Sequence, residues 1–384
     1  MRIHLIVLPL LAVSLAGQAT WIVDSGNPGA LPNLAAAVAV AADGDIIEVQ
    51  HASEAMLGNL VIDKSLRIIG NVQGDATQFL FVNGGGLEVQ LPAGKELVLA
   101  NCQLTTWWGA GLPPPGLVII DCAGRVVVQD LPNSNSPVTI LRSDDVFWSR
   151  VELTATTPMQ IADSTVVFDR CTLIGRSADY EHGRPSTHAM QINDAVVHCV
   201  DTFVGGGNAA WHLGGWEPNM PGTRALASVA SFVTMAGDDT LVTSGNFTTL
   251  PPVQSTGTTF VFPLNFSPAI DGTATVTHLQ LPSVDVAASS QSLSLTVRSP
   301  LGSLSGLLFG SPGDRTAIPA VLGDLWLDPL SLCTPLAGIQ NGSLTWTVAL
   351  PPAPVLFGQS YRWQGIALLG ATIVLGAPGG TVMR

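Results

Sequence analysis

Charged residues are scarce in this sequence. They make up 11% of its 384 residues, and acidic residues outnumber basic ones, so the formal net charge is −13. Soluble domains usually carry about a quarter charged residues. A chain so poor in lysine and arginine is a weak match for nucleic-acid backbones or anionic membrane surfaces, which attract basic patches. Neither is expected as a partner.

Cysteine is too sparse to build a disulfide framework. The five cysteines are scattered, none forms the CxxC pair of a zinc site, and their odd number leaves at least one unpaired in a monomer. Cys102 and Cys122 lie one apparent repeat apart and are expected on adjacent rungs, as buried thiols that pack like small hydrophobic groups. No cofactor is expected, and calcium is the one metal worth considering.

Long hydrophobic runs are also missing after residue 19. No later stretch reaches about 18 apolar residues without glycine, proline or charge, so no transmembrane segment is predicted. Residues 1–19 resemble a secretory signal peptide: Arg2 and His4 form a polar start, Leu5–Ala16 is apolar, and Gly17–Ala19 offers small residues for cleavage. The protein is therefore expected to be secreted or displayed at the cell surface.

Short β-rich segments, in contrast, recur along the chain. Leu97–Cys102 is echoed at Leu117–Cys122, Val146–Leu153 is echoed at Val166–Leu173, and the pattern returns in Val196–Gly205. Such echoes, with loops of varying length and no helical periodicity, are typical of a solenoid. Each unit is too short to bury its own apolar face, so neighbouring units must stack. The pattern predicts a parallel β-helix.

The segment before these repeats contains a specific series of short sequence motifs. Trp21-Ile22-Val23 precedes an alanine-rich amphipathic segment at residues 34–42, and Gly44-Asp45 and then Lys64-Ser65-Leu66 follow. This block resembles the N-terminal entry of secreted right-handed β-helix proteins of the pectin-lyase-like superfamily. Their usual Gly-x-Tyr after the GD strand is replaced here by residues 51–54. The resemblance covers roughly residues 20–245 and implies a helical cap on the first coil.

The chain changes character near residue 250. Pro251–Gly257 is predicted to be a linker, and the strands after it have turns every ten or so residues without the earlier echo, which indicates an antiparallel sandwich. Gly310–Gly313, residues 323–329 and Trp363–Gly365 resemble C-terminal modules of large secreted proteins from planctomycete-type bacteria. The predicted fold is all-β: signal peptide 1–19, right-handed parallel β-helix with N-terminal cap 20–250, linker 251–257 and β-sandwich 258–384.

The pectin-lyase-like superfamily includes polysaccharide lyases and hydrolases, so their active-site patterns have to be tested. The side chains that could serve a calcium-dependent lyase are Asp144, Asp145, Asp163, Asp169, Asp194, Arg150 and Arg170. Aspartate is also what a turn before a strand selects, and the two arginines fit solvated outer rungs, so a structural role is favoured. The hydrolase aspartate set is incomplete, and no nucleophile elbow is present. The chain is expected to be non-catalytic.

Two polar insertions, at residues 176–188 and 208–222, interrupt the repeats. The candidate ligand-binding residues in them are Tyr180, Glu181, His182, Arg184, His188, Trp211, His212, Trp216 and Glu217. Tryptophan beside carboxylates and histidine suits a sugar ring, although both tryptophans could instead anchor their loop. The expected partner is a polysaccharide or cell-surface glycan. The alternatives are a divergent polysaccharide lyase or glycoside hydrolase, and a structural surface spacer.

Overall fold

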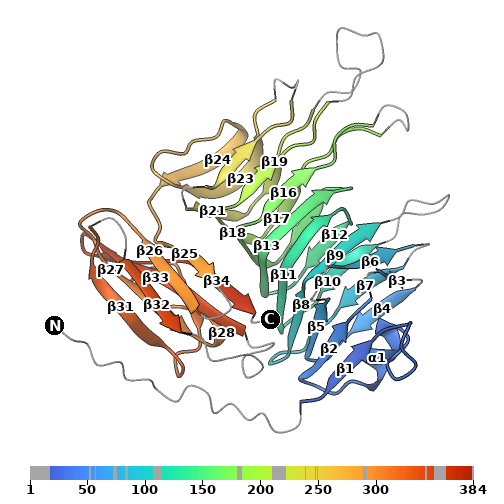
Figure 1. Cartoon of the computed structure of the whole chain (residues 1–384). Coiled ribbons are helices and arrows are strands. Elements are labelled where there is room, and N and C mark those ends of the chain that lie inside the picture. Colours follow the sequence, from blue (N-terminus) through green and yellow to red (C-terminus); the bar gives the residue numbers. More distant parts are fainter. Residues whose placement is uncertain are drawn as a thin grey trace.

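The computed structural model describes residues 18–382, apart from 52, 57, 72–75, 83–84, 107–114, 180–183, 210–221, 238, 247, 249, 289–291, 342–343 and 350–359. Strands form most of the described chain, in a long stack of parallel strands followed by antiparallel sheets (Figure 1). The predicted parallel β-helix followed by a β-sandwich is confirmed.

The coils of the β-helix have three sides, which we call its first, second and third columns. The first column contains β1 (Thr20–Val23), β2 (Asp45–Val49), β5 (Leu66–Gly70), β8 (Glu96–Ala100), β11 (Arg125–Ser134), β13 (Asp145–Ala155), β15 (Thr165–Asp169), β18 (Val196–Val200), β21 (Phe232–Ala236) and the C-terminal halves of β23 (Val253–Phe262) and β24 (Ile270–His278). The second contains β4 (Asn59–Ile62), β7 (Gly86–Val89), β10 (Gly116–Ile120), β12 (Val138–Leu141), β14 (Met159–Ala162), β17 (Met190–Asn193), β20 (Leu226–Val229) and the start of β23 and β24. The third contains β3 (Ser53–Met56), β6 (Thr77–Phe81), β9 (Cys102–Thr106), the ends of β11 and β13, β16 (Thr172–Gly175), β19 (Phe203–Gly205) and β22 (Leu241–Thr243).

The core is a set of side-chain ladders inside the coils. One ladder of the first column runs through Ile47, Ile68, Leu99, Val128, Trp148, Phe168, Cys199 and Met235. Each of these residues is buried in one continuous hydrophobic cluster. Parallel strands stack about 4.8 Å apart, so similar shapes must recur at each rung, and the sequence echoes are the result.

The bends after the first and second columns share a local device. A residue with positive φ comes first, such as Asp163 or Asp194, both at 47°. A small polar residue often follows: Ser164 Oγ donates to the carbonyl of Ala162 at 2.6 Å and accepts from the N–H of Ser143 in the preceding coil at 3.1 Å. Backbone groups that would be unpaired at the bend are thereby satisfied. Asp163 and Asp194 thus lie at bend positions whose positive φ suits aspartate, asparagine or glycine.

One of the sequence echoes does not correspond to stacked residues. Leu97 pairs with Val126 in the first column, whereas Leu117 pairs with Leu87 and Val138 in the second. The expectation that Cys102 and Cys122 occupy adjacent rungs is therefore wrong. Strands of all three columns alternate apolar and polar residues in the same way, so the sequence pattern does not show to which column a strand belongs. The expectation of buried thiols is confirmed: the described cysteines are unbridged, and all but the half-buried Cys333 are buried.

A short helix closes the first coil, as the sequence predicts. Helix α1 (Leu34–Val40) begins at Asn33, whose side chain accepts from the Ala36 N–H at 2.8 Å. At its other end, Lys64 Nζ donates to the carbonyls of Val38 and Ala41 at 3.0 and 2.9 Å. The motif lysine therefore serves as the C-terminal cap of the helix.

The aspartate of the Gly44-Asp45 motif fixes the first turn. Its carboxylate accepts from the Trp21 indole at 2.8 Å and from the backbone N–H groups of Ala19 and Ala42 at 2.9 Å each. Burial works against the charge, but these hydrogen bonds prevail and lower the pKa of Asp45 below its usual value. The motifs of the N-terminal block are thus explained by contacts between residues that lie far apart in the sequence.

The parallel stack extends past the expected linker. Residues 253–257 open β23, which pairs with β20 and β21, and β24 adds a further parallel strand that ends at His278. Pro251 and Pro252 lie just before β23, where proline leaves the ladder of hydrogen bonds intact. The linker prediction for 251–257 is therefore corrected, since the antiparallel strands begin only at Ser283.

The C-terminal part forms a sandwich around its own core. One sheet contains β25 (Ser283–Ala288), β26 (Ser292–Arg298) and β32 (Leu344–Ala349). The other contains β27 (Leu304–Gly310), β29 (Val321–Leu322), β31 (Cys333–Ile339), β33 (Ser360–Leu369) and β34 (Thr372–Val382). A separate two-stranded sheet pairs β28 (Pro312–Ala317) with β30 (Asp324–Leu327). Val284, Leu295, Leu307 and Trp363 fill the space between the sheets.

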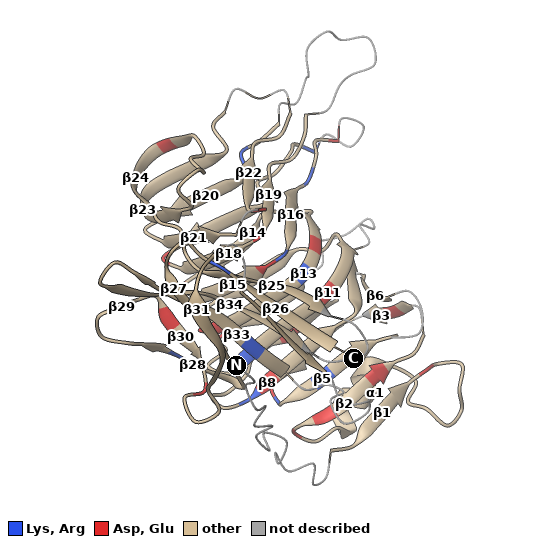
Figure 2. Cartoon of the chain, turned by 60° about the vertical axis from the view of Figure 1, so that its left-hand side comes forward, with Lys and Arg blue, Asp and Glu red and all other residues tan. Residues whose placement is uncertain are grey.

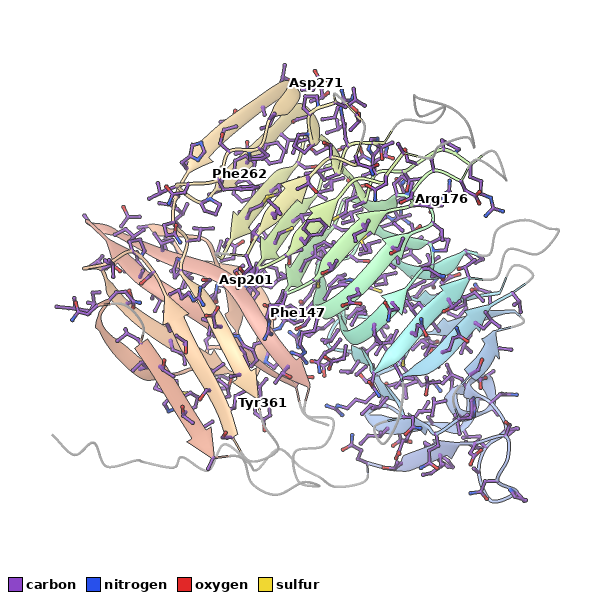
Figure 3. The ribbon with its side chains drawn as sticks, turned by 45° about the horizontal axis from the view of Figure 1, so that its top comes forward. Phe147, Arg176, Asp201, Phe262, Asp271 and Tyr361 are labelled. Carbon is purple, nitrogen blue, oxygen red and sulfur yellow. The ribbon has the colours of Figure 1, made fainter. Side chains whose placement is uncertain are left out.

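The sandwich packs on the outside of the first column. A row of outward-facing residues there, which we call the docking row, consists of Val98, Val127, Phe147, Val167, His198, Thr234 and Val261. Trp326 of β30 is buried against its first four members. Figure 3 shows Phe147 at this seam and Arg176 on the far side of the solenoid.

Candidate functional site

Both polar insertions leave the solenoid at one corner, between the third and second columns. The first lies between β16 and β17, and the second lies between β19 and β20. We call this edge the loop corner. The docking row lies on the remaining side of the coil, so the loop corner faces away from the sandwich (Figure 1).

The bases of the two insertions are tied to each other through the backbone. The Ala178 N–H donates to the Asn208 carbonyl at 2.8 Å, and the Gly207 N–H donates to the Thr187 carbonyl at 3.0 Å. The next coil joins them, because the Asn246 side chain accepts from the Ala209 N–H at 2.8 Å. Three successive coils therefore present their loop bases side by side.

Glycine makes this close approach possible. A Cβ on Gly207 would lie 1.9 Å from the Arg176 carbonyl oxygen, and a Cβ on Gly245 would lie 1.9 Å from the Gly207 carbonyl oxygen. Real Cβ atoms do not approach other atoms so closely, so any side chain at these positions would push the coils apart. Glycine at 207 and 245 fixes the spacing of the loop bases.

Arginines gather at this corner of an otherwise acidic protein. Arg176 donates to the carbonyls of Thr156 and Pro185 at 2.7 and 3.0 Å. Burial lowers its pKa, and the charge of nearby Arg184 lowers it further, while Asp179 acts in the opposite direction. Arg224, at the base of the second insertion, pairs with Asp271 of β24. Figure 2 shows basic residues beside β16 at this edge.

Two of the predicted site residues lie among the described residues. Arg184 forms a reciprocal backbone pair with Asp179, at 2.9 and 2.8 Å, which closes the first insertion at its base. His188 Nδ1 lies 3.0 Å from the Arg224 carbonyl oxygen. Because a carbonyl can only accept, Nδ1 carries the proton and Nε2 of the neutral ring remains an acceptor.

The other predicted site residues fall outside the described residues. They are Tyr180, Glu181, His182, Trp211, His212, Trp216 and Glu217. Sequence reasoning did not single out Arg176 or Arg224, the arginines at the two loop bases. The available signal was their position in a chain with few basic residues: Arg176 is the first residue of the first insertion, and Arg224 lies two residues after the end of the second.

The residues considered for a calcium site are dispersed. Asp169 pairs with Arg170 at 2.5 Å, Asp145 pairs with Arg125 at 2.7 Å, and Arg150 pairs with Asp130 at 2.6 Å. The two arginines are therefore ion-paired rather than simply solvated. Within the described ranges, no group of three or more histidine, cysteine, aspartate or glutamate side chains is arranged to hold a metal ion.

Comparisons with known proteins add little. No family model matches the chain, and no curated protein matches it. One solved structure that matches is the cell-surface-expressed multi-modular chitinase ChiW from Paenibacillus sp. str. FPU-7, with 11% identity over 89% of this chain and 24% of that one, and a TM-score of 0.18. This chain thus spans about a quarter of that protein's length, and at this TM-score the likeness supports no inference. In the described part of the chain, no helix is long and apolar enough to cross a membrane.

Proposed function

We propose that this is an exported, non-catalytic polysaccharide-binding protein whose ligand site is the loop corner. The observation that carries the proposal is the juxtaposition of the two loop bases, joined by the hydrogen bonds between Ala178 and Asn208 and between Gly207 and Thr187. Side chains of both insertions would then reach one ligand. An insertion is exempt from the shape repetition that stacking imposes on the coils, so its residues can serve binding.

The charges at the corner favour an acidic polysaccharide. Arg176 and Arg184 interact electrostatically at this corner, whereas the charge of Arg224 is balanced by Asp271. Arginine binds carboxylates with directed hydrogen bonds. Local positive charge on a protein of formal net charge −13 would direct an anionic chain to this edge.

The family resemblance is part of the same proposal. Trp21, Asp45 and Lys64 of the N-terminal block have structural roles in closing the first coil, which fits an entry of the pectin-lyase-like kind. The sandwich would be a C-terminal module like those of planctomycete-type secreted proteins. Export rests on the signal-peptide character of residues 1–19.

Affinity electrophoresis of the full chain in gels that contain pectate, alginate or a neutral glucan tests the proposal. Retardation by an acidic polysaccharide is expected. The Arg184→Gln variant should lose about 1–2 kcal/mol of that binding, or five- to thirty-fold in affinity. Arg298→Gln is the matched control, because Arg298 pairs with Asp285 in the sandwich.

A second pair of variants probes the insertions directly. Trp216→Ala combined with His182→Ala should abolish binding without lowering thermal stability, whereas His278→Ala, an exposed histidine of β24, should change neither. A wild-type protein that is retarded by none of the polysaccharides would favour a surface spacer. Release of unsaturated uronic-acid ends, detected by ultraviolet absorbance, would identify a lyase instead.

A further inference from the structure

A cavity of about 220 Å³ lies between the docking row and the sandwich. Its solenoid wall includes Val196, His198 and Phe232, its sandwich wall includes Leu375, and Leu281 of the segment between β24 and β25 also lines it. The side chains that line it are mainly apolar. Cavities between two structural units with apolar walls and a few polar atoms are typical of small-ligand sites. This cavity lies on the face away from the loop corner, so nothing below depends on glycan binding.

One polar atom in the wall has no partner. His198 Nδ1 lies 2.6 Å from Thr234 Oγ1, and the ring packs edge-on against Trp326 at 5.7 Å. The other ring nitrogen, Nε2, is buried without a hydrogen-bond partner. Burial, reinforced by the charge of Arg315 and opposed by Asp324, lowers the pKa of His198 to about 4, so the ring is neutral at pH 7. A buried ring nitrogen without a hydrogen-bond partner destabilises the folded state.

The charged groups in the wall satisfy each other. Arg315 Nε lies 2.6 Å from Asp324 Oδ2, and the same guanidinium donates to Thr165 Oγ1 at 2.9 Å. This pair also borders a second cavity of about 500 Å³, where Asp145 is held by Arg125 and Arg362. A charged ligand would have to compete with these ion pairs. A neutral ligand would leave them intact.

We propose that the 220 Å³ cavity binds a neutral single-ring alcohol or phenol, with its hydroxyl on His198 Nε2. An apolar cavity of about 150 Å³ holds benzene, so this one suits a ring with a short alkyl chain, about ten non-hydrogen atoms in all. The apolar body would lie against Phe232, Leu281 and Leu375.

A hydroxyl fits either tautomer of His198. If Nδ1 carries the proton and donates to Thr234 Oγ1, Nε2 accepts from the ligand. If Thr234 donates instead, Nε2 carries the proton and donates to the ligand. A hydroxyl can serve in both arrangements, whereas a carbonyl or an ammonium group can serve in only one.

Two matched probes test the proposal on the full chain. 4-Propylphenol and propylbenzene differ by one hydroxyl, and their binding is measured by calorimetric titration. The phenol should bind at least about tenfold more tightly, because it relieves the unpaired nitrogen. Val261→Phe fills the cavity from the docking row and should weaken binding of both probes.

Variants at the ring separate the hydroxyl contact from simple apolar binding. His198→Leu should abolish the preference for the phenol while retaining propylbenzene. If that variant does not fold, Thr234→Val removes the hydroxyl that orients the His198 ring. It should reduce the difference in affinity between 4-propylphenol and propylbenzene. Thr345→Val, whose hydroxyl pairs with Thr296 in the sandwich, is the matched control and should leave both affinities unchanged.

The proposal is overturned if neither probe binds the wild-type protein saturably. Binding that Val261→Phe leaves unaffected would place the ligand elsewhere. Equal affinities for the two probes, or an unchanged preference in His198→Leu, would refute the contact with Nε2.

Discussion

Asp201 carries a carboxylate in a setting that disfavours its charge. It occupies a bend at φ 45°, and its Oδ1 accepts from the Asp239 N–H at 3.2 Å. Burial raises its pKa to about 6, the Asp239 N–H opposes that rise, and the carboxylates of Asp285, Asp169 and Asp239 add to it. The folded protein therefore holds a proton here that the unfolded chain, with a pKa near 3.8, releases.

The pH dependence of stability follows from this shift. Between pH 3.8 and about 6 the folded state binds more protons at Asp201, so the free energy of unfolding decreases as pH rises through this window. His198 acts in the opposite sense, since its pKa of about 4 lies below the usual 6.5 and its contribution is lost as pH falls. The two effects partly cancel in the wild-type protein.

The Asp201→Asn variant should separate the contribution of Asp201 to the pH dependence of stability from that of His198. Asparagine tolerates positive φ and keeps an acceptor for the Asp239 N–H, but it carries no charge. The variant should be more stable than the wild type at pH 8 and should lose this advantage near pH 4. Melting temperatures across that range, with exposed Asp163→Asn as the control at another positive-φ bend, provide the measurement. A pH profile identical to that of the wild type would contradict the assignment.

The cysteines differ in reactivity because they differ in burial. Burial raises the pKa of Cys199 to about 12 and also raises that of Cys102 and Cys171. Iodoacetamide reacts with the thiolate, so half-buried Cys333 should be alkylated first and the other four only after unfolding. Peptide mass spectrometry without reductant should find all five alkylated in denaturant. A Cys102–Cys122 bridged peptide would be inconsistent with the structure.

At the scale of elements, two lysines near the cap have different roles. Lys64 donates to two carbonyls at the C-terminus of α1, whereas Lys95 forms an exposed ion pair with Asp43. Hydrogen bonds from a charged group to helix carbonyls contribute more than a surface ion pair, whose typical contribution is about 0–1 kcal/mol.

Lys64→Met should therefore destabilise the protein by about 1–2 kcal/mol, and Lys95→Met should change stability by less than about 0.5 kcal/mol. Urea unfolding followed by circular dichroism measures both. Equal losses in the two variants would mean that the helix cap does not depend on Lys64.

The sequence predicts the stacking of some strands, but it does not show which of their side chains face outward. The echo of Val146–Leu153 at Val166–Leu173 is matched by strand pairing, because buried ladders require similar shapes in successive coils. The docking row was not predicted, because Val127 and Phe147 look like core residues in the sequence although they point outward. Most of the predicted ligand-binding set lies outside the described residues, so the sequence remains its sole basis. The loop corner itself became visible only through the backbone contacts between coils.

At the scale of the whole molecule, the solenoid and the sandwich share a buried seam. Asp145 is bound by Arg125 at 2.7 Å and by Arg362 of β33 at 2.8 Å. The Arg362 guanidinium lies 5.2 Å from the centre of the Phe147 ring and 5.9 Å from that of Trp326. Breaking one partner of such a buried pair would leave a charge uncompensated. The two parts are therefore expected to unfold together.

The Trp326→Ala variant should uncouple the unfolding of the sandwich from that of the solenoid. Trp326 is 1% exposed and covers the apolar part of the docking row, so its removal should cost about 3–5 kcal/mol, most of it at the seam. Calorimetry should show one transition for the wild type and two for the variant. Trp346→Ala, which weakens the sandwich core away from the seam, should lower the melting temperature without splitting the transition. Two calorimetric transitions already present in the wild type would show that the seam does not couple the solenoid and the sandwich.

Limited proteolysis gives an independent measure of this coupling. The wild type should resist cleavage at 251–257, which leads into β23, whereas Trp326→Ala should be cut between His278 and Ser283.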